Sequence, residues 1–121
     1  MKDDPMINDP YVGAPALVEQ SAQLADMFRT INEKGLDCPD PLIREFLLGQ
    51  AAYNDRLHLA DPEISADDYL TPALDLITYD RRYFTWSPAG PGPDSNTWSG
   101  DNGMLEYVRA QWLTAQQNAR R

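Results

Sequence analysis

The sequence contains little of what catalytic and metal sites are usually built from. Among 121 residues it has one cysteine, Cys38, and one histidine, His58. A single cysteine excludes an internal disulfide and a metal site built from several cysteines. No phosphate-binding glycine loop, nucleophile elbow or paired-histidine zinc motif occurs. We therefore predict no catalytic residue, no metal site and no cofactor. Cys38 is interpreted as inert, because the neighbouring carboxylates of Asp37 and Asp40 disfavour its thiolate.

Long hydrophobic runs and basic side chains are also scarce. No stretch approaches the roughly 18 apolar residues of a membrane-spanning helix, and residues 1–5, MKDDP, lack the apolar core of a signal peptide. Ten Lys and Arg against nineteen Asp and Glu give a formal net charge of −9, whereas nucleic-acid phosphates require clustered basic side chains. The sequence therefore predicts an acidic cytoplasmic protein that binds neither membrane nor nucleic acid directly. Its expected partner is another protein, and self-association stays open.

The stretch from 40 to 59 has the highest apolar content and is predicted to be the central helix. Asp40 is a suitable N-cap, and Pro41 fits the first helical position, where its missing N–H costs nothing. The apolar residues fall on two neighbouring faces, as expected of a helix that is contacted from two sides. Gly49, which costs roughly 1 kcal/mol relative to alanine in mid-helix, indicates close approach of another backbone.

Residues 14–34 form the clearest amphipathic pattern. Leu17, Leu24 and Ile31 recur every seven positions, and acidic residues recur on the opposite face of the predicted helix. Gly35 is suited to the end of such a helix. Because the following connection is short, we expect this helix to form an antiparallel hairpin with the central helix.

Residues 65–83 are predicted to form a third helix, kinked at Pro72, and the alternative is that a new helix begins there with Thr71 as its cap. Ser65 begins a pattern that resembles a capping box, and a proline in a helix interior removes one backbone hydrogen bond. A rival interpretation is a β-hairpin of residues 76–79 and 83–86, because aromatic and β-branched residues cluster there. We favour the helix.

Residues 85–103 contain three prolines and four glycines and are predicted to form a long irregular loop. Loops longer than about 12–15 residues are uncommon in compact domains and are usually functional or disordered. Trp86 and Trp98 flank the loop, which favours attachment at both ends. A fourth helix is predicted over residues 103–119. Its buried stripe is formed by Leu105, Val108, Trp112 and Ala115.

Together these patterns predict an all-α fold, a small domain of four helices. The chain has the usual length of one domain. We expect the domain to span residues 14–121. Residues 1–13, which contain two Asp-Pro steps, are expected to form an irregular N-terminal arm.

Residues 61–80 form a strongly acidic block without Lys or Arg. The simplest interpretation is a solvated face whose members also cap helices. The alternatives are recognition of a basic partner surface and metal binding, although the spacing does not match a calcium-binding loop. The block contains Asp61, Glu63, Asp67, Asp68, Asp75 and Asp80, and we call the first five the acidic patch.

Aromatic and arginine side chains near the irregular segments are the candidate docking residues. Trp, Tyr and Arg dominate the energetics of protein interfaces. For the two loop tryptophans the favoured interpretation is nevertheless that they anchor the loop, and for the two arginines that they neutralise the acidic block. The candidates are Tyr11, Arg81, Arg82, Tyr83, Trp86 and Trp98.

Three functions are compatible with this sequence. The preferred one is a non-catalytic protein–protein interaction protein, such as an adaptor, accessory subunit or assembly component, that docks through the arm and the Trp-flanked loop. The second is an acidic inhibitor or nucleic-acid mimic that binds the basic groove of a nucleic-acid-binding protein. The third is a small enzyme that uses His58 with a carboxylate, for which Asp55 and Asp61 are the candidates. No motif supplies a nucleophile for it.

Overall fold

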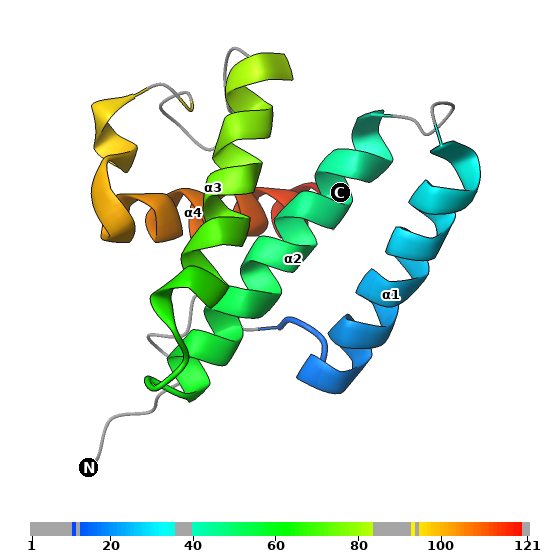
Figure 1. Cartoon of the computed structure of the whole chain (residues 1–121), viewed down its shortest axis with the longest axis horizontal. Coiled ribbons are helices and arrows are strands. Elements are labelled where there is room, and N and C mark those ends of the chain that lie inside the picture. Colours follow the sequence, from blue (N-terminus) through cyan, green and yellow to red (C-terminus); the bar gives the residue numbers. More distant parts are fainter. Residues whose placement is uncertain (1–10, 12, 36–39, 84–92, 94, 120–121) are drawn as a thin grey trace.

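The computed structural model of the chain is mainly helical in its described part (Figure 1). This part contains no strand, which confirms the all-α, four-helix fold. No helix in it is long and apolar enough to cross a membrane. The predictions for Cys38, for Trp86 and for most of the arm lie outside the described residues. The structure describes residues 11, 13–35, 40–83, 93 and 95–119.

Helix α2 is the centre of the molecule. It packs against each of the other three helices, as its two apolar faces predict. In Figure 1 it lies between α1 and α3, and α4 crosses behind α2 and α3. The elements are α1 (Leu17–Lys34), α2 (Asp40–Ala60), α3 (Ala66–Tyr83), the short 3-10 helix η3 (Asn96–Trp98) and α4 (Gly100–Ala119).

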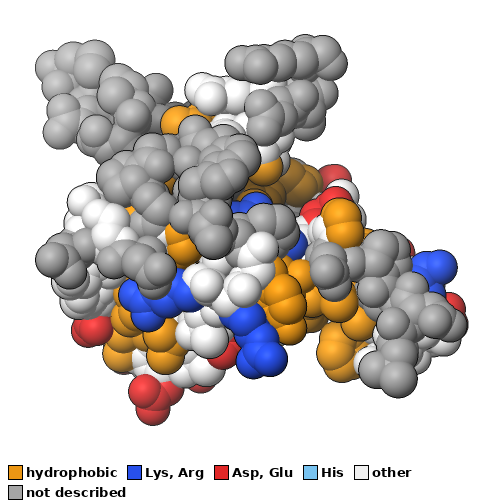
Figure 2. All heavy atoms as spheres, turned by 90° about the horizontal axis from the view of Figure 1, so that it is seen from above, with side chains coloured by type: hydrophobic (Ala, Val, Ile, Leu, Met, Phe, Trp, Pro, Cys, Tyr) orange, Lys and Arg blue, Asp and Glu red, His pale blue; other side chains and the backbone are white. Residues whose placement is uncertain are grey.

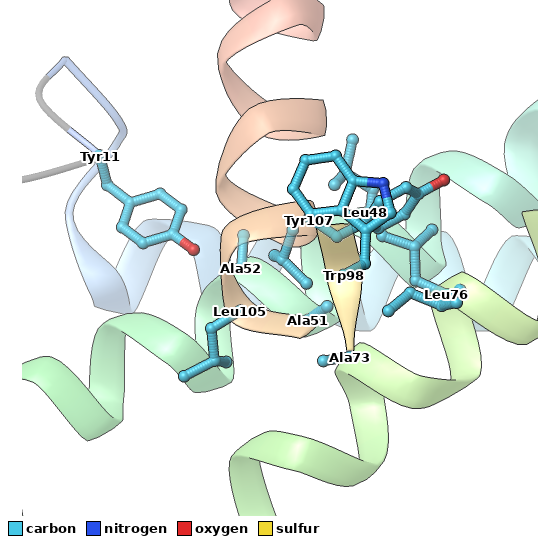
Figure 3. Close-up of a cluster of buried hydrophobic side chains, with 11 residues drawn as sticks. Tyr11, Leu48, Ala51, Ala52, Ala73, Leu76, Trp98, Leu105 and Tyr107 are labelled. Carbon is cyan, nitrogen blue, oxygen red and sulfur yellow. The ribbon is translucent and has the colours of Figure 1, made fainter. Parts of the chain in front are cut away.

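Small side chains of α2 and α3 belong to the centre of the core. Ala51, Ala52 and Ala73 have no exposed surface and lie within the cluster of buried apolar side chains (Figure 3). Larger apolar side chains surround them, and each one that is fully buried stabilises the fold by about 1.5–3 kcal/mol. The larger members of this core include Leu48, Leu76, Ile77, Leu105 and Val108.

Helix α1 packs against α2 alone among the described helices. It begins at Leu17 instead of residue 14, and Gln20 is its one fully buried residue. Gly35 ends it with a φ of +56° and donates its N–H to the carbonyl of Ile31, as expected of a glycine at a helix C-terminus. Since α1 has a single neighbour, much of its surface stays exposed.

The predicted close contact at Gly49 is confirmed, but the prediction that a backbone makes it is wrong. A Cβ atom at this position would lie 2.9 Å from Cδ2 of Leu24, so the close neighbour is a side chain of α1 and not a backbone. The carbonyl oxygen of Gly49 also accepts a hydrogen bond from Nε2 of Gln20 at 3.3 Å. The glycine therefore brings α1 close to α2.

Helix α3 continues as one helix to Tyr83, so the rival hairpin is wrong for the described residues. Pro72 lies inside this helix without dividing it. The hydroxyl of Ser65 accepts the backbone N–H of Asp67 at 3.3 Å, which caps the helix start. Burial of the α3 face that carries Leu76 and Ile77 outweighs the β propensity of the residues that follow.

The predicted loop ends earlier than expected. Residues 96–98 form η3, and α4 begins at Gly100 instead of residue 103. Gly103 lies inside α4, where a Cβ atom would approach the carbonyl carbon of Trp98 to 2.5 Å. This glycine therefore serves close packing of η3 on α4, and it lies three residues inside the helix instead of at its start.

Candidate functional site

Two buried carboxylates organise the polar interior. Asp55 of α2 is fully buried and binds Arg109 of α4 through two hydrogen bonds, of 2.7 Å from Nε and 2.9 Å from Nη2. The hydroxyl of Tyr11 donates to the same carboxylate at 2.5 Å. In Figure 3 the ring of Tyr11 extends from the N-terminal segment into the molecule. This network joins the end of the arm to α2 and α4.

Asp80 of α3 is the centre of a second network. Arg44 of α2 donates to its two oxygens at 2.8 and 2.7 Å, and the hydroxyl of Tyr107 on α4 donates to it as well. Arg44 also donates to the amide oxygen of Gln111 at 3.0 Å. The network therefore joins α2, α3 and α4.

The electrostatics of both networks favour a structural role. Burial raises the pKa of Tyr11 and of Tyr107, and the bonded carboxylate adds to the increase in each case. The hydrogen bond to Asp80 raises the pKa of Arg44, and that to Asp55 raises the pKa of Arg109. The phenols therefore stay protonated as donors and the arginines stay charged. Each carboxylate is neutralised and hydrogen-bonded, which is what a buried charge requires.

These networks change the interpretation of three acidic or aromatic residues. Asp80 was expected to belong to a solvated block, but it is buried in an ion pair. Asp55 was a candidate to orient His58, but its oxygens bind Arg109 and Tyr11. The side chain of Tyr11, a candidate docking residue, is 3% exposed and offers a partner almost no surface in this conformation.

A sequence signal for both carboxylates exists, although it did not enter our predictions. Asp55 follows Leu48, Ala51 and Ala52 at the helical spacing of seven, four and three residues. Asp80 follows Ala73, Leu76 and Ile77 at the same three spacings. A carboxylate that continues an apolar stripe must find a cation inside the fold. The pattern marks the two buried acids, but it does not show which arginine binds each.

Trp98 lies in the core. Its side chain is 8% exposed, and its ring meets that of Tyr107 edge-on at 5.3 Å between ring centres. This geometry supports the anchoring interpretation of Trp98. Trp112, expected in the core, is half-buried and packs against it, with its ring 5.9 Å from that of Tyr11.

The three candidates at the end of α3 lie at the surface. Arg81 donates from Nε to the carbonyl of Pro93 at 3.1 Å. The guanidinium of Arg82 lies 5.6 Å from the ring centre of Tyr83, which is 53% exposed and 4.7 Å from the ring of Tyr79. Their role in docking stays a prediction.

His58 stacks on Tyr69, with 3.8 Å between ring centres and 14° between ring planes. Its buried Nδ1 has no hydrogen-bond partner among the described residues. The stack joins α2 to α3, which is a packing role.

The acidic patch is exposed over its whole length. Its carboxylates form no ion pair within the described residues, and that of Asp61 accepts the backbone N–H of Glu63 at 3.0 Å. In the described part no three His, Cys, Asp or Glu residues are grouped as metal ligands. The geometry is that of a solvated face, and the role of the patch in binding stays a prediction.

A pocket of about 330 Å³ lies between α1, α2 and α4, and we call it the α1–α4 groove. Its floor and walls are mainly apolar, and hydrophobic side chains reach the surface towards the α1 side of the molecule (Figure 2). The groove exists because α1 packs on α2 without reaching α4. The apolar lining comes from Leu24, Met27, Leu48, Gly49, Trp112 and Ala115, and the polar lining from Gln20, Gln23, Glu45 and Gln116.

The α1–α4 groove brings together none of the predicted site residues. It was missed because each helix pattern shows which face is apolar but not how far two helices lie apart. Comparisons of the chain with protein-family models, curated proteins and solved structures found no match. The function of the groove is therefore argued from its geometry and chemistry.

Proposed function

We propose that the protein is a non-catalytic interaction protein, such as an adaptor, accessory subunit or assembly component, that receives an apolar helix of another protein in the α1–α4 groove. The apolar lining of this groove is the observation that carries the proposal. Recognition of a helix in a groove relies on a few apolar anchors that enter such a site. The proposed surface differs from the arm and the loop, because Tyr11 and Trp98 are buried.

The shape and composition of the groove support a helix as its occupant. Its walls are themselves helices, and Met27 and Trp112 provide an adaptable and a large apolar surface on opposite sides. Gln23 and Gln116 supply polar groups like those that surround the apolar centre of an interface. A second copy of the chain is a poorer occupant, since it carries the same net charge of −9.

The position of the ionisable groups supports a non-catalytic role. The two buried acids are bound by arginine and tyrosine from other segments, so they hold helices together. Neither Asp55 nor Asp80 lines the groove. The groove lining is instead mainly apolar and contains Glu45 as its one charged side chain among the described residues.

The test is a matched pair of arginine substitutions on α1. Met27→Arg places a charged side chain in the groove wall, whereas Val18→Arg changes a residue of the same helix that is 77% exposed and does not line the groove. Partners are captured with the full chain from lysate of its native source. We expect Met27→Arg to weaken the capture of one partner about tenfold or more, equivalent to 1.4 kcal/mol, and Val18→Arg to leave it unchanged.

Circular dichroism of both variants shows whether the helices persist. Equal capture by the wild type and by Met27→Arg would overturn the proposal. Analytical ultracentrifugation tests whether a second copy of the chain occupies the groove instead. A dimer that Met27→Arg dissociates and Val18→Arg does not would assign the groove to self-association.

A second candidate function is the acidic inhibitor or nucleic-acid mimic. It is favoured by the exposure of all five carboxylates of the acidic patch. Neutralising Asp67, Asp68 and Asp75 to asparagine should then remove binding to a basic groove, and the wild-type affinity should fall steeply with salt. Binding that is insensitive to salt would exclude this function.

A further inference from the structure

Glu45 is the one charged side chain among the described residues that line the α1–α4 groove. It precedes Leu48 and Gly49 of the groove floor by three and four positions, which places it on the same face of α2. Its side chain is exposed and forms no ion pair within the described part of the chain. The groove thus presents an unneutralised carboxylate beside an apolar floor.

Arginines of the surrounding helices are held elsewhere. Arg44, the neighbour of Glu45 in sequence, is bound through two hydrogen bonds by Asp80. Arg56 donates hydrogen bonds at the contact between the start of α1 and α2. Arg29 forms an ion pair with Asp26, and Arg109 forms one with Asp55. Among the described residues no cation pairs with Glu45, so we expect the occupant to supply one.

The other polar groups of the groove do not select a charge. Gln20 is used at both ends, since its Nε2 donates to the carbonyl of Gly49 and its Oε1 accepts from Arg56 at 2.6 Å. Gln23 and Gln116 are neutral and provide both donors and acceptors. Among the described residues that line the groove, Glu45 is therefore the one that can select the occupant by its charge.

We infer that the occupant is an amphipathic helix that carries Lys or Arg about one turn from its apolar anchors, so that the cation pairs with Glu45. This inference rests on the proposed function and adds the charge of the partner to it. Like-charge repulsion by Glu45 disfavours a helix with Asp or Glu at that position. The net charge of −9 opposes an acidic helix over a longer range.

Two synthetic amphipathic helices test the inference on the full chain. They share one leucine face, and lysine flanks this face in the first peptide and glutamate in the second. Fluorescence anisotropy of the labelled peptides at physiological salt gives the two dissociation constants. We expect the lysine peptide to bind about tenfold or more tightly than the glutamate peptide, and Met27→Arg to abolish its binding.

A matched pair of charge neutralisations separates a specific contact from general attraction. Glu45→Gln and Glu63→Gln each remove one negative charge from an exposed side chain, but only Glu45 lines the groove. We expect Glu45→Gln to raise the dissociation constant of the lysine peptide about twofold to fivefold, which is the effect of one exposed ion pair. Glu63→Gln should leave the dissociation constant unchanged.

Each other outcome overturns a defined statement. Equal effects of Glu45→Gln and Glu63→Gln would overturn the inference, because the peptide would then respond to net charge alone. Equal affinity for the two peptides, with loss of both in Met27→Arg, would overturn the inference and leave the proposed function standing. Absence of binding, or binding that Met27→Arg does not change, would overturn the inference and count against the groove as a helix site.

Discussion

At the scale of single residues, Asp55 and Asp80 connect segments that are distant in the chain. Each carboxylate binds one arginine and one tyrosine from other segments. Removing one partner of such a buried pair costs about 3–5 kcal/mol, because it leaves a charge without compensation. Their positions on apolar stripes can be seen in the sequence. Their partners depend on how the helices cross, which no stripe encodes.

Tyr107→Phe tests how much the hydrogen bond between Tyr107 and Asp80 contributes to stability. The change removes the hydroxyl that donates to Asp80 and keeps the ring that packs against Trp98. We expect the free energy of unfolding to fall by about 1–3 kcal/mol, as for a hydrogen bond to a charged group. Urea denaturation measures the change. Tyr83→Phe is the control, since Tyr83 is exposed, and an equal effect of both variants would contradict the prediction.

At the scale of elements, helix existence follows from periodicity and helix ends do not. The apolar periods of residues 17–31 and the cap Ser65 predict α1 and the start of α3 correctly. The start of α4 was misplaced because a glycine within a Pro/Gly-rich stretch resembles a loop residue. Gly103 instead permits contact with the backbone of Trp98. Sequence pattern does not separate a flexible glycine from one needed for close packing.

Gly103→Ala and Gly49→Ala form a matched pair that tests which of the two glycines is needed for close packing between elements. Both add a methyl group to a helix and gain about 1 kcal/mol of helix propensity. At Gly103 the new Cβ meets the backbone of Trp98 at 2.5 Å, whereas at Gly49 it meets the end of the Leu24 side chain at 2.9 Å. We expect Gly103→Ala to destabilise the fold by about 1–3 kcal/mol and Gly49→Ala to be nearly neutral. Thermal denaturation compares them, and the reverse order would be inconsistent with this packing.

At the scale of the whole molecule, the fold has two parts: helices α2, α3 and α4, which the two networks connect, and helix α1, which the groove separates from α4. Helices α2, α3 and α4 are joined by buried ion pairs, whereas α1 is attached to α2 alone among the described helices. The number and order of the helices follow from the sequence. The groove does not, because it depends on the distance between α1 and α4, which share no pattern. The charge of −9 is known from composition, but the position of Glu45 beside the groove floor is a property of the fold.

Alkaline pH tests the contribution of the two networks to the stability of the whole molecule. Tyr11 and Tyr107 have pKa values raised by burial in the folded state, whereas an unfolded tyrosine titrates near about 10. Above that pH the unfolded chain binds fewer protons than the folded one, so the free energy of unfolding falls. The stabilisation is complete below pH 10 and is lost as the pH rises towards the raised values.

Urea denaturation between about pH 9 and pH 11 measures this loss, which amounts to at most about 1.4 kcal/mol per pH unit for each buried tyrosine. Tyr107→Phe should make the dependence shallower, because it removes one of the two buried phenols. A free energy of unfolding that does not change across this range would contradict the prediction.

Trp112 belongs to two environments at once. Its ring meets that of Tyr11, which Asp55 holds at the end of the arm, and it also forms part of the wall of the α1–α4 groove. A ligand that displaced this indole would alter the packing of Tyr11, and release of Tyr11 would remove a contact that supports the groove wall. Such coupling is thermodynamically reciprocal. We therefore expect docking of Tyr11 and binding in the groove to influence each other's affinity through the ring of Trp112.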